Sequence, residues 1–403
     1  MVDEARMKTR IGIVGAGFAG LGLALALARK GFSPTVIEKR SEEQLRNEGI
    51  FLTLAPNGMN ALRGLGLAEA ALERGIETRG LIFHNAHGRT LGALDYTKHA
   101  QRFAAPSVTI RRGELVSILL AASRTAGIRM RFGAAVEAIV ETPSEVLVHG
   151  PDGGTEGFDI LVAADGLRST VRHLGMPELP LPIYSGLQGS GGIVDIPEVP
   201  DTDGRMLMTF GRNAFFGYLK AADGPVYWFN TYRQTDETRA QPLTGTALLQ
   251  YLAELHRPDP EVNRRIIAAA DPVSIRAYPD YDIPSLAHWS VGRTVLIGDA
   301  AHAVTPHSGQ GASMALEDAL VLAAAIAVET TPTQAFRRFE SLRRARVEAA
   351  VRLGRQSGGP KKAQGWLSLR LRDLLLPLVI PFGQKAQEKF FAYRADRDPL
   401  SPP

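Results

Sequence analysis

Runs of apolar residues at the start of the chain predict short buried strands joined by a helix. Residues 10–14, Arg-Ile-Gly-Ile-Val, predict a buried strand, which a glycine turn joins to an Ala/Leu-rich helix that extends to about Lys30. Gly31 is placed to end this helix as a C-cap, and residues 35–38 predict the next strand. The chain therefore opens with a strand, a helix and a second strand, as parallel α/β domains do.

The same type of pattern returns at later points of the chain. Two further buried strands are predicted, one ending at Asp165 and one at residues 294–300. The other elements expected for this part are helices at 113–126, 311–329 and 333–353, short strands at 128–132, 134–141 and 145–149, and a hairpin turn at 151–154.

The middle of the chain has a different pattern. Between about residues 177 and 282, alternating aromatic-containing stretches such as RMLMTF, AFFGYL and VYWFNTYR favour antiparallel strands that half cover a surface. Residues 79–97 are expected to join this sheet. The fold class is therefore α/β, with a mainly antiparallel β-sheet domain inserted into a nucleotide-binding domain and with helices at the C-terminal end.

These patterns predict a discontinuous domain organisation. The expected divisions are 1–75, 105–176 and 285–355 for the nucleotide-binding domain, 76–104 and 177–284 for the substrate-binding β-sheet domain, and 356–403 for a C-terminal helical tail.

Composition excludes several kinds of chemistry. The 403 residues include no cysteine, so disulfides, thiolate catalysis, zinc–thiolate sites and iron–sulfur clusters are excluded, and no metal site is expected. The net charge of +4 comes from scattered basic residues, which favours small anionic ligands, and no nucleic-acid-binding motif accompanies it. The N-terminus lacks the apolar region of a secretory signal, and the apolar stretch at 374–382 is too short to span a membrane, so a cytoplasmic protein is expected.

The first chemical motif is Gly15-Ala16-Gly17-Phe18-Ala19-Gly20, between the first strand and its helix. A pyrophosphate must approach backbone N–H groups and the positive end of a helix closely. Gly15 permits the tight turn, Gly17 leaves room for phosphate, and Gly20 lets the helix pack on the strand. Glu38 ends the next strand, where a carboxylate can accept hydrogen bonds from the ribose hydroxyls of an adenosine. The coincidence of these features predicts a dinucleotide site.

Two further motifs place an acidic residue at the carboxyl end of a buried strand. Residues 165–172 read DGLRSTVR, and residues 298–302 read GDAAH, followed by Pro306, Gly309 and Gly311. Open α/β sheets bind ligands at this edge, where Asp299 can bind a ribityl hydroxyl. Gly309 and Gly311 open a helix whose N–H groups can stabilise negative charge on an electron-rich ring.

In order and spacing, GAGFAG, DGLRSTVR and GDAAHAVTPHSGQGASMALED resemble the flavoprotein aromatic hydroxylases of the p-hydroxybenzoate hydroxylase fold. The likeness spans residues 10 to about 350 and extends to the phenazine, salicylate and tetracycline monooxygenases of that class. It implies an FAD-binding Rossmann-like domain of the GR2 type, one non-covalent FAD, NADPH or NADH as reductant, and O2 as oxygen source. It further implies that a C4a-hydroperoxyflavin hydroxylates a planar phenolic, quinolone or polycyclic substrate, as in secondary metabolism.

The resemblance also assigns cofactor-binding positions in this chain. Arg46 would lie beside the mobile isoalloxazine, Asp165 would support the pyrophosphate and nicotinamide regions, and Pro306, Gly309, Gly311 and Ala312 would line the pyrimidine side of the flavin. The remaining positions expected to hold FAD are Gly15, Gly17, Phe18, Ala19, Gly20, Glu38, Lys39, Arg40, Arg112, Val136 and Asp299.

Candidates for substrate contact come from the aromatic strands and from the PHSGQG segment. They are Tyr218, Trp228, Asn230, Tyr232 and His307, although ordinary sheet core is the competing interpretation for each sheet residue. No residue stands out as an acid–base catalyst, and His302 is expected to be structural. The arginine-rich helix around residues 337–346 is expected to present a solvated face.

The apolar tail and the oligomeric state leave alternatives open. The segment LSLRLRDLLLPLVIPF is expected to pack over the substrate entrance, with a membrane surface or a subunit contact as the alternative, and the chain is expected to be a monomer or a homodimer. Competing functions are an FAD-dependent epoxidase or reductase of isoprenoids, a non-catalytic FAD-binding module and a flavin-dependent halogenase. The halogenase motif Trp-x-Trp-x-Ile-Pro is absent, because Trp228, Trp289 and Trp366 stand apart.

Overall fold

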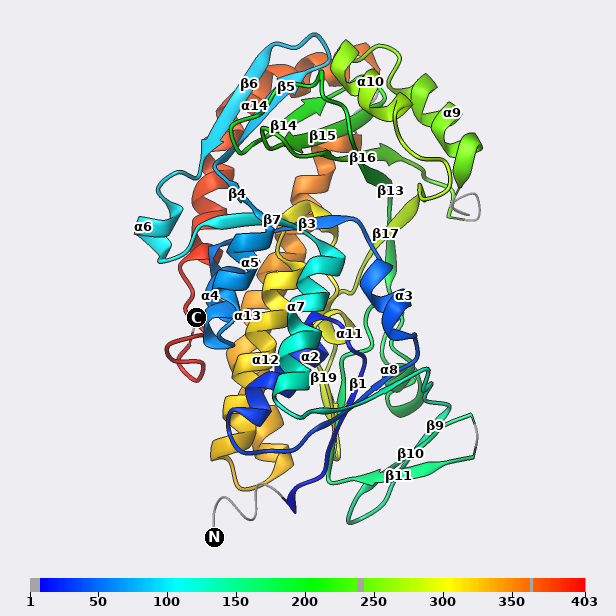
Figure 1. Ribbon diagram of the computed structural model, residues 1–403, viewed down its shortest axis with the longest axis vertical. Coiled ribbons are helices and arrows are strands. Elements are labelled where there is room, and N and C mark those ends of the chain that lie inside the picture. Colours follow the sequence, from blue (N-terminus) through cyan, green and yellow to red (C-terminus); the bar gives the residue numbers. More distant parts are fainter. Residues whose placement is uncertain (1–7, 152, 238–242, 363–364, 403) are drawn as a thin grey trace.

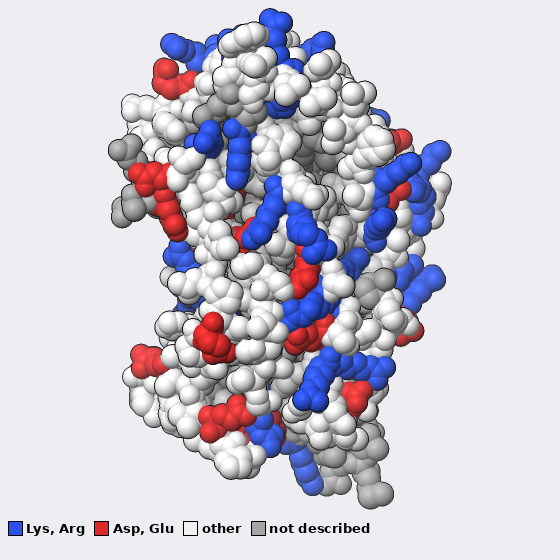
Figure 2. Space-filling model, turned by 180° about the vertical axis from the view of Figure 1, so that it is seen from behind, with Lys and Arg blue, Asp and Glu red and all other residues white. Residues whose placement is uncertain are grey.

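The structure is a computed structural model that describes residues 8–402 except 152, 238–242 and 363–364. A seven-stranded sheet occupies one end of the elongated molecule, and a six-stranded sheet with its helices occupies the other (Figure 1). On the back of the molecule, Lys and Arg are interspersed with Asp and Glu (Figure 2). That face therefore presents no continuous basic field of the kind that binds nucleic acid.

The six-stranded sheet is assembled from distant parts of the chain. Its order is β18-β19-β12-β1-β2-β8, and every neighbouring pair is parallel except β18 with β19. Its strands are β1 (Ile11–Val14), β2 (Thr35–Glu38), β8 (Arg129–Phe132), β12 (Ile160–Ala163), β18 (Ser290–Val291) and β19 (Thr294–Leu296). β1 and β12 are buried at every position, as expected for parallel strands covered on both faces.

Long helices pack around this sheet. The helices of this part are α2 (Phe18–Ala28), α3 (Glu42–Asn47), α4 (Pro56–Gly64), α5 (Ala68–Arg74), α7 (Arg112–Thr125), α8 (Thr170–Gly175), α11 (Asp299–His302), α12 (Gly311–Val328) and α13 (Pro332–Gly358). α12 is the one helix in the described part of the chain that is long and apolar enough to cross a membrane, and 78% of it is buried in the fold. It packs against α2, α4 and α13, so its apolar composition serves the core.

Two three-stranded sheets flank the central layers. One has the order β3-β7-β4, with β3 (Phe51–Leu54), β4 (Ile76–Thr78) and β7 (Ser107–Arg111), and lies between the two large sheets (Figure 1). The other is the meander of β9 (Ala138–Glu141), β10 (Val146–His149) and β11 (Thr155–Phe158). The predicted hairpin turn at 151–154 joins β10 to β11, and its residue 152 lies outside the described residues.

The seven-stranded sheet has the order β17-β13-β16-β15-β14-β5-β6. Its strands are β5 (Gly80–Asn85), β6 (Thr90–Asp95), β13 (Ile183–Val194), β14 (Arg205–Phe210), β15 (Ala214–Lys220), β16 (Val226–Arg233) and β17 (Tyr278–Asp282). All pairings are antiparallel except that of β14 with β5. The prediction that residues 79–97 join the aromatic strands in one sheet is confirmed.

Two helices that the sequence patterns did not predict cover one face of this sheet. α9 (Gly245–Leu255) and α10 (Glu261–Ala268) lie above it in Figure 1 and pack on it through Leu248, Leu252 and Ile266. We call this the outer face; it carries Phe216, Tyr218, Trp228, Asn230 and Tyr232. The opposite, inner face carries Phe83, Met208, Phe210, Phe215, Tyr227 and Phe229.

The C-terminal helices complete the fold. α13 ends at Gly358 and is followed by the short 3-10 helix η2 (Gly359–Lys362) and by α14 (Trp366–Phe391). α14 continues through Pro377 and Pro381 and packs on β6, while its outward side exposes large apolar residues such as Trp366 and Phe382. Two smaller elements are α6 (His99–Phe103) and the 3-10 helix η1 (Pro306–Ser308). The helical tail was predicted, but its passage through two prolines was not.

Candidate functional site

The GAGFAG turn forms a cradle at the N-terminus of α2. Gly15 has φ of +104°, which favours glycine, and a side chain on Gly20 would place its Cβ 1.9 Å from the carbonyl oxygen of Gly15. Gly17 has an ordinary extended backbone, and a Cβ added to it would meet no atom within 4 Å. The fold itself therefore requires Gly15 and Gly20, whereas the room above Gly17 is available to a ligand at a helix N-terminus.

Glu38 stands beside this turn at the end of β2. Its carboxylate accepts hydrogen bonds from the backbone N–H of Ala16 (2.8 Å) and from the Nε of Arg40 (2.8 Å). Burial alone would raise the pKa of Glu38, but these donors hold it below the usual value. The carboxylate is therefore ionised and fixed beside the glycine turn. Lys39, between these two residues, is exposed.

A second charged pair lies across the site. The Arg112 guanidinium lies 5.2 Å from the Phe18 ring centroid and makes no hydrogen bond to any residue that the structure describes. Burial lowers the pKa of Arg112, which Asp299 partly offsets. Asp299 is exposed to solvent by its accessible area, but desolvation by the surrounding protein raises its pKa. An enclosed cation with free donors, next to a helix N-terminus, suits the anionic pyrophosphate of FAD.

Asp165 lies at the carboxyl end of β12, in the first turn of the DGLRSTVR segment. Its Oδ2 accepts a hydrogen bond from the backbone N–H of Val171 at 3.1 Å, while its buried Oδ1 has no partner in the described structure. Burial raises the pKa of this carboxyl group. An unpartnered buried oxygen at this edge of the sheet is consistent with a cofactor hydroxyl or a bound water as its missing donor.

The segment after α11 presents an open surface at the start of α12. A Cβ atom on Gly309 or Gly311 would meet nothing within 4 Å, and Pro306 is exposed. Ala312 is half-buried and packs on the core. The N-terminus of an 18-residue helix thus faces free space, which fits an electron-rich ring that carries negative charge when reduced.

Two of the residues assigned to the cofactor by resemblance have other neighbours in the structure. Three hydrogen bonds hold the Arg46 guanidinium, two to Glu42 and one to Ser117 on α7. Contact with a flavin ring would require Arg46 to leave these partners. Val136 lies in the hydrophobic core, at 8% exposure, and can reach a cofactor only through its backbone or a small part of its side chain.

The aromatic residues proposed for substrate contact lie on the outer face of the seven-stranded sheet, and this placement corrects that expectation. Tyr218, Trp228, Asn230 and Tyr232 are buried beneath α9 and α10. Asn230 is also held in a buried hydrogen-bonded network with Ser190 and His256. A substrate cannot reach this face without displacing two helices.

The inner face instead looks toward the nucleotide-binding part. The ring of Phe51 on β3 lies 5.4 Å from Tyr227 and 6.3 Å from Phe229, and the Nε of Arg111 lies 3.4 Å from the Tyr227 hydroxyl. Phe215 lies 6.0 Å from Phe229 on the same face. Phe215 and Phe229 also belong to an apolar cluster with Leu376 and Ile380 of α14, so this helix covers part of the inner face.

His307 lies at the junction of these two surfaces. Its Nε2 is 3.3 Å from Oδ2 of Asp280 on β17, and its Nδ1 is 3.1 Å from Nζ of Lys361 in η2. Burial lowers the pKa of His307, and Lys361 adds to the effect. Neither Asp280 nor Lys361 was singled out in the sequence, since a lone Asp in a strand and a Lys after a helix break carry no motif.

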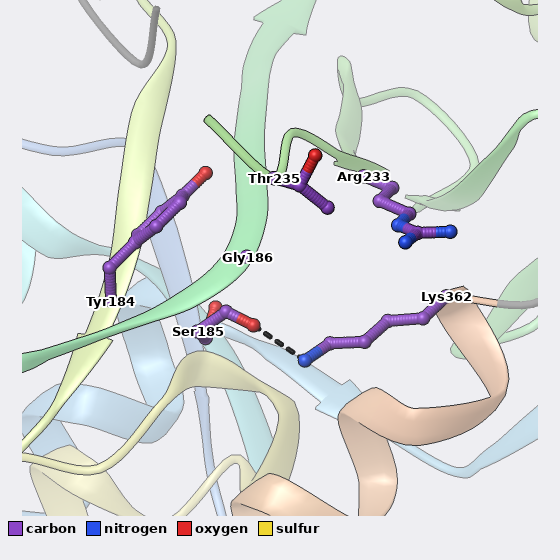
Figure 3. Close-up of a pocket in the computed structure, with 6 residues that line it drawn as sticks. All are labelled: Tyr184, Ser185, Gly186, Arg233, Thr235 and Lys362. Atoms are coloured by element: carbon purple, nitrogen blue, oxygen red, sulfur yellow. Dashed lines mark hydrogen bonds between the residues drawn. The ribbon is translucent and has the colours of Figure 1, made fainter. Parts of the chain in front are cut away.

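A pocket of about 460 Å³ opens beside this junction (Figure 3). It is lined by Tyr184, Ser185, Gly186, Arg233, Thr235 and Lys362, and Nζ of Lys362 donates to the Ser185 carbonyl. Burial and the charge of Asp280 raise the pKa of Tyr184 to about 12. Its lining residues lie on β13, at and just after the end of β16, and in η2, outside the GAGFAG cradle.

A buried ionic network joins α12 and α13 next to the GDAAH turn. The Arg343 guanidinium contacts Glu317 and Asp318 at 2.6 and 2.7 Å, and Arg346 contacts Glu317 at 2.8 Å. Asp318 in turn accepts a hydrogen bond from the backbone N–H of Gly298 and lies 2.6 Å from Nε2 of His302. Burial opposes ionisation, but these partners hold the pKa values of Glu317 and Asp318 below their usual range.

This network corrects one expectation and agrees with another. The arginine-rich helix does not present only a solvated face, because Arg343 and Arg346 point into the core while Arg337 and Arg338 are exposed. His302 has the structural role that the sequence suggested. The network ties α12 and α13 to Gly298 and His302 of the GDAAH turn, on either side of Asp299.

Comparisons with known proteins agree with this geometry. Residues 8–354 match a family described as an FAD binding domain. An aurachin C monooxygenase/isomerase of Stigmatella aurantiaca is 32% identical over 375 residues, which cover 92% of this chain and 95% of that protein. A 3-amino-4-hydroxybenzoate 2-monooxygenase of Streptomyces cremeus is 31% identical over 407 residues, which cover 99% of this chain and 94% of that protein.

A solved structure shows the same fold. Klebsiella pneumoniae HpxO complexed with FAD and uric acid has a TM-score of 0.82 at 23% identity, with 96% of this chain and 98% of that chain covered. The open cradle at Gly17, the free donors of Arg112 and the unpartnered oxygen of Asp165 fit FAD at the corresponding edge of this sheet. The chain therefore belongs to the FAD-binding family and is an FAD-dependent monooxygenase of the class A aromatic hydroxylases.

Proposed function

We propose that this enzyme hydroxylates a planar phenolic or fused-ring aromatic compound, taking electrons from NADH or NADPH and one oxygen atom from O2. The observation that carries the proposal is that the open start of α12 lies close to the aromatic inner face. His307, which precedes Gly309 and Gly311, contacts Lys361, and Nζ of Lys361 lies 4.2 Å from the ring centroid of Phe215.

The residues of this chain have separable roles in the proposal. The cradle at Gly17, with Glu38 and Arg112, binds the adenosine and pyrophosphate end of FAD and keeps it fixed. The start of α12 faces the ring end, where its N–H groups stabilise negative charge. The aromatic rings of the inner face hold the substrate flat and exclude water. FAD, when bound, supplies the electron transfer from the nicotinamide and the activation of O2.

The names of the relatives indicate the chemical range of substrates to try. One relative is named for an aminohydroxybenzoate and another for aurachin C. Electron-rich phenols fit the chemistry, because the ring attacks the activated oxygen and no general base is then needed from the protein. Among the described residues, His307 with Asp280 and Lys361 is the one titratable cluster that we find near Phe215. The proposal therefore assigns no general base to the protein.

The test is the consumption of NADH and NADPH by the purified holoenzyme in oxygenated buffer, with and without each aromatic compound. A substrate should accelerate nicotinamide oxidation, and its product should carry one atom of label when the gas is ¹⁸O2. Stimulated oxidation that yields only hydrogen peroxide identifies a non-substrate effector. The proposal is refuted if no phenolic or fused-ring compound in the set gains labelled oxygen.

A further inference from the structure

Three residues from three separate elements form a buried chain at the edge of the inner face. Asp280 lies on β17, His307 on η1 and Lys361 on η2. The imidazole is between the other two, with Nε2 at 3.3 Å from the carboxylate and Nδ1 at 3.1 Å from the ammonium. The side chains of His307 and Asp280 are 3% and 7% exposed, so solvent scarcely reaches this arrangement.

The hydrogen-bond chemistry fixes the protonation of the imidazole. An ammonium group has only donors, so Nδ1 of His307 must accept from Lys361. The neutral ring then carries its proton on Nε2, which lies 3.3 Å from Oδ2 of Asp280 but does not have the geometry of a hydrogen bond to it. The negative charge of Asp280 is thus separated from Lys361 by a neutral ring, and it does not contact the cation directly.

Lys361 therefore retains donors that no described residue uses. Its Nζ has one hydrogen bond, to His307, and lies 4.2 Å from the Phe215 ring centroid. Phe215 belongs to the inner face, and η2 packs against β16 beside it. The ammonium therefore lies at the aromatic surface proposed for the substrate, with capacity to bind an anion.

The surroundings hold the ammonium and its partner in place. A side chain on Gly358 would place its Cβ 2.8 Å from the His307 ring, so the end of α13 closes on the imidazole. Lys362, the next residue, points away and donates to the carbonyl of Ser185 in the pocket of Figure 3. The two consecutive lysines thus differ: Lys361 is enclosed and has unused hydrogen-bond donors, whereas Lys362 is exposed and donates to a backbone carbonyl.

We propose that Lys361, positioned by His307 and Asp280, binds an anionic oxygen of the aromatic substrate, a carboxylate or a phenolate. This inference rests on the proposed function and specifies its substrate as an acidic aromatic compound. A charge-assisted hydrogen bond in an enclosed apolar site fixes one end of a planar ring, so it determines which edge of that ring faces the flavin. The imidazole accepts a hydrogen bond from Nζ and so holds it beside the ring of Phe215.

The experiment measures substrate affinity through the flavin absorbance change of the holoenzyme. The probes are 3-amino-4-hydroxybenzoate, its amide, which lacks the carboxylate charge, and 3-amino-4-methoxybenzoate, which lacks the ionisable hydroxyl. We expect the acid to bind at least tenfold more tightly than one of the two analogues, and that analogue identifies the anionic oxygen. An acid that binds no better than either analogue overturns the inference.

Variants separate the role of Lys361 from general effects. Lys361→Met should weaken the affinity for the acid at least tenfold and leave that for the weaker analogue unchanged, whereas Lys361→Arg should retain most of the affinity. Lys362→Met is the matched control and should bind the acid as the wild type does. Equal affinity for the acid in Lys361→Met and the wild type overturns the inference.

The pH dependence of wild-type affinity provides a test that needs no variant. The titratable groups around Nζ are Asp280 on β17, His307 on η1, Lys362 on η2 and Tyr184 on β13. Burial lowers the pKa of Lys361 to about 8, so its charge is complete below that pH and is lost above it. Affinity for the acid should fall as pH rises through about 8, while affinity for the amide stays constant if the carboxylate is the anionic group. An acid affinity that does not change between pH 7 and 9 contradicts the assignment.

The outcomes also distinguish this inference from the proposed function. If neutral aromatics gain ¹⁸O while acids bind no more tightly, the enzyme is an aromatic hydroxylase and Lys361 is not its anion site. If acids bind in a Lys361-dependent manner but no aromatic gains labelled oxygen, the anion site stands and the proposed reaction fails.

Discussion

Replacement of Gly17 by valine should separate folding from cofactor binding. In the protein without ligand, a Cβ on Gly17 meets no atom within 4 Å, and the backbone angles of −79° and −169° are extended and suit a β-branched residue. The expected change in the fold is the loss of a preferred N-cap residue, which costs roughly 0.5–1.5 kcal/mol. The thermal unfolding temperature of the apoprotein should therefore fall only slightly.

The same valine should strongly weaken FAD binding. Its branched side chain fills the space where the pyrophosphate approaches the N-terminus of α2, and at least one hydrogen bond between a backbone N–H and a charged phosphate is lost. Such a bond contributes about 1.5–3 kcal/mol, which corresponds to a roughly 10- to 150-fold weaker dissociation constant. Titration of apoprotein with FAD, followed by flavin fluorescence, measures this change.

The control is the neighbouring glycine of the same turn. At Gly20 even an alanine would place its Cβ 1.9 Å from the carbonyl oxygen of Gly15, so Gly20→Ala should lower the unfolding temperature of the apoprotein itself. The reasoning would be refuted if Gly17→Val bound FAD as tightly as the wild type. It would also be refuted if Gly17→Val lost as much apoprotein stability as Gly20→Ala.

Four further outcomes are expected. Arg343→Met should destabilise the protein by about 3–5 kcal/mol in chemical denaturation, because Glu317 and Asp318 stay buried without their cation; a loss below 1 kcal/mol would contradict the role of the network. The pKa values of Glu317 and Asp318 are lowered in the folded state, so their contribution to the free energy of unfolding is complete above the unfolded-state pKa values near pH 4. This contribution is lost as pH falls through the folded-state pKa values. Stability should therefore fall more steeply with decreasing pH in the wild type than in Glu317→Gln. Gly311→Leu should retain FAD but release hydrogen peroxide in place of hydroxylated product, as measured by peroxide formed per nicotinamide oxidised; unchanged coupling would remove the start of α12 from the reacting ring. Acid precipitation should release all FAD into the supernatant, because the chain has no cysteine to form a thioether, and flavin in the pellet would indicate a covalent link.

The nucleotide-binding half of the fold was predictable because its signals are local. A buried strand, a glycine turn and a helix follow one another within residues 11–28, and the strands before Asp165 and Asp299 carry the same apolar character. Each acidic residue follows its strand directly, so the edge where they meet could be expected from parallel topology alone. The resemblance assigned both Arg112 and Asp299 to the cofactor, and in the structure the two side chains influence each other electrostatically.

The two faces of the seven-stranded sheet could not be assigned from the sequence. In β15 and β16 both faces are apolar, with Phe215 beside Phe216 and Trp228 beside Phe229, so alternation identifies two faces but not which one is covered. The deciding elements are α9 and α10, whose patterns lie between aromatic strands and were not predicted as helices. Trp228 is buried because α9 and α10 pack on its face of the sheet, whereas Phe229 points to the opposite face and contacts Phe51 on β3.

Long-range polar partners were equally hidden. Arg343 and Arg346 belong to an arginine-rich helix that looks solvated along the sequence, and only the pairing with Glu317 and Asp318 on α12 makes their burial favourable. Lys361 follows a helix break and carries no motif, and its meaning depends on Asp280, which lies 81 positions earlier. Such sites can be recognised only in the tertiary structure, because their residues lie far apart in the sequence and come together when the chain folds.

The strand order of the six-stranded sheet has a consequence for how the protein is made. β12 pairs with β1 on one side and with β19 on the other, and α12 packs directly on α2. A nascent chain that has emerged from the ribosome only to about residue 290 has an unpaired edge at β12 and an uncovered apolar surface on α2. The GAGFAG turn is therefore synthesised long before β19 and α12, which pack around it. FAD can therefore be captured stably only near the end of translation, once α13 has joined, and chains shortened before that point are expected to aggregate instead of accumulating as flavin-free protein.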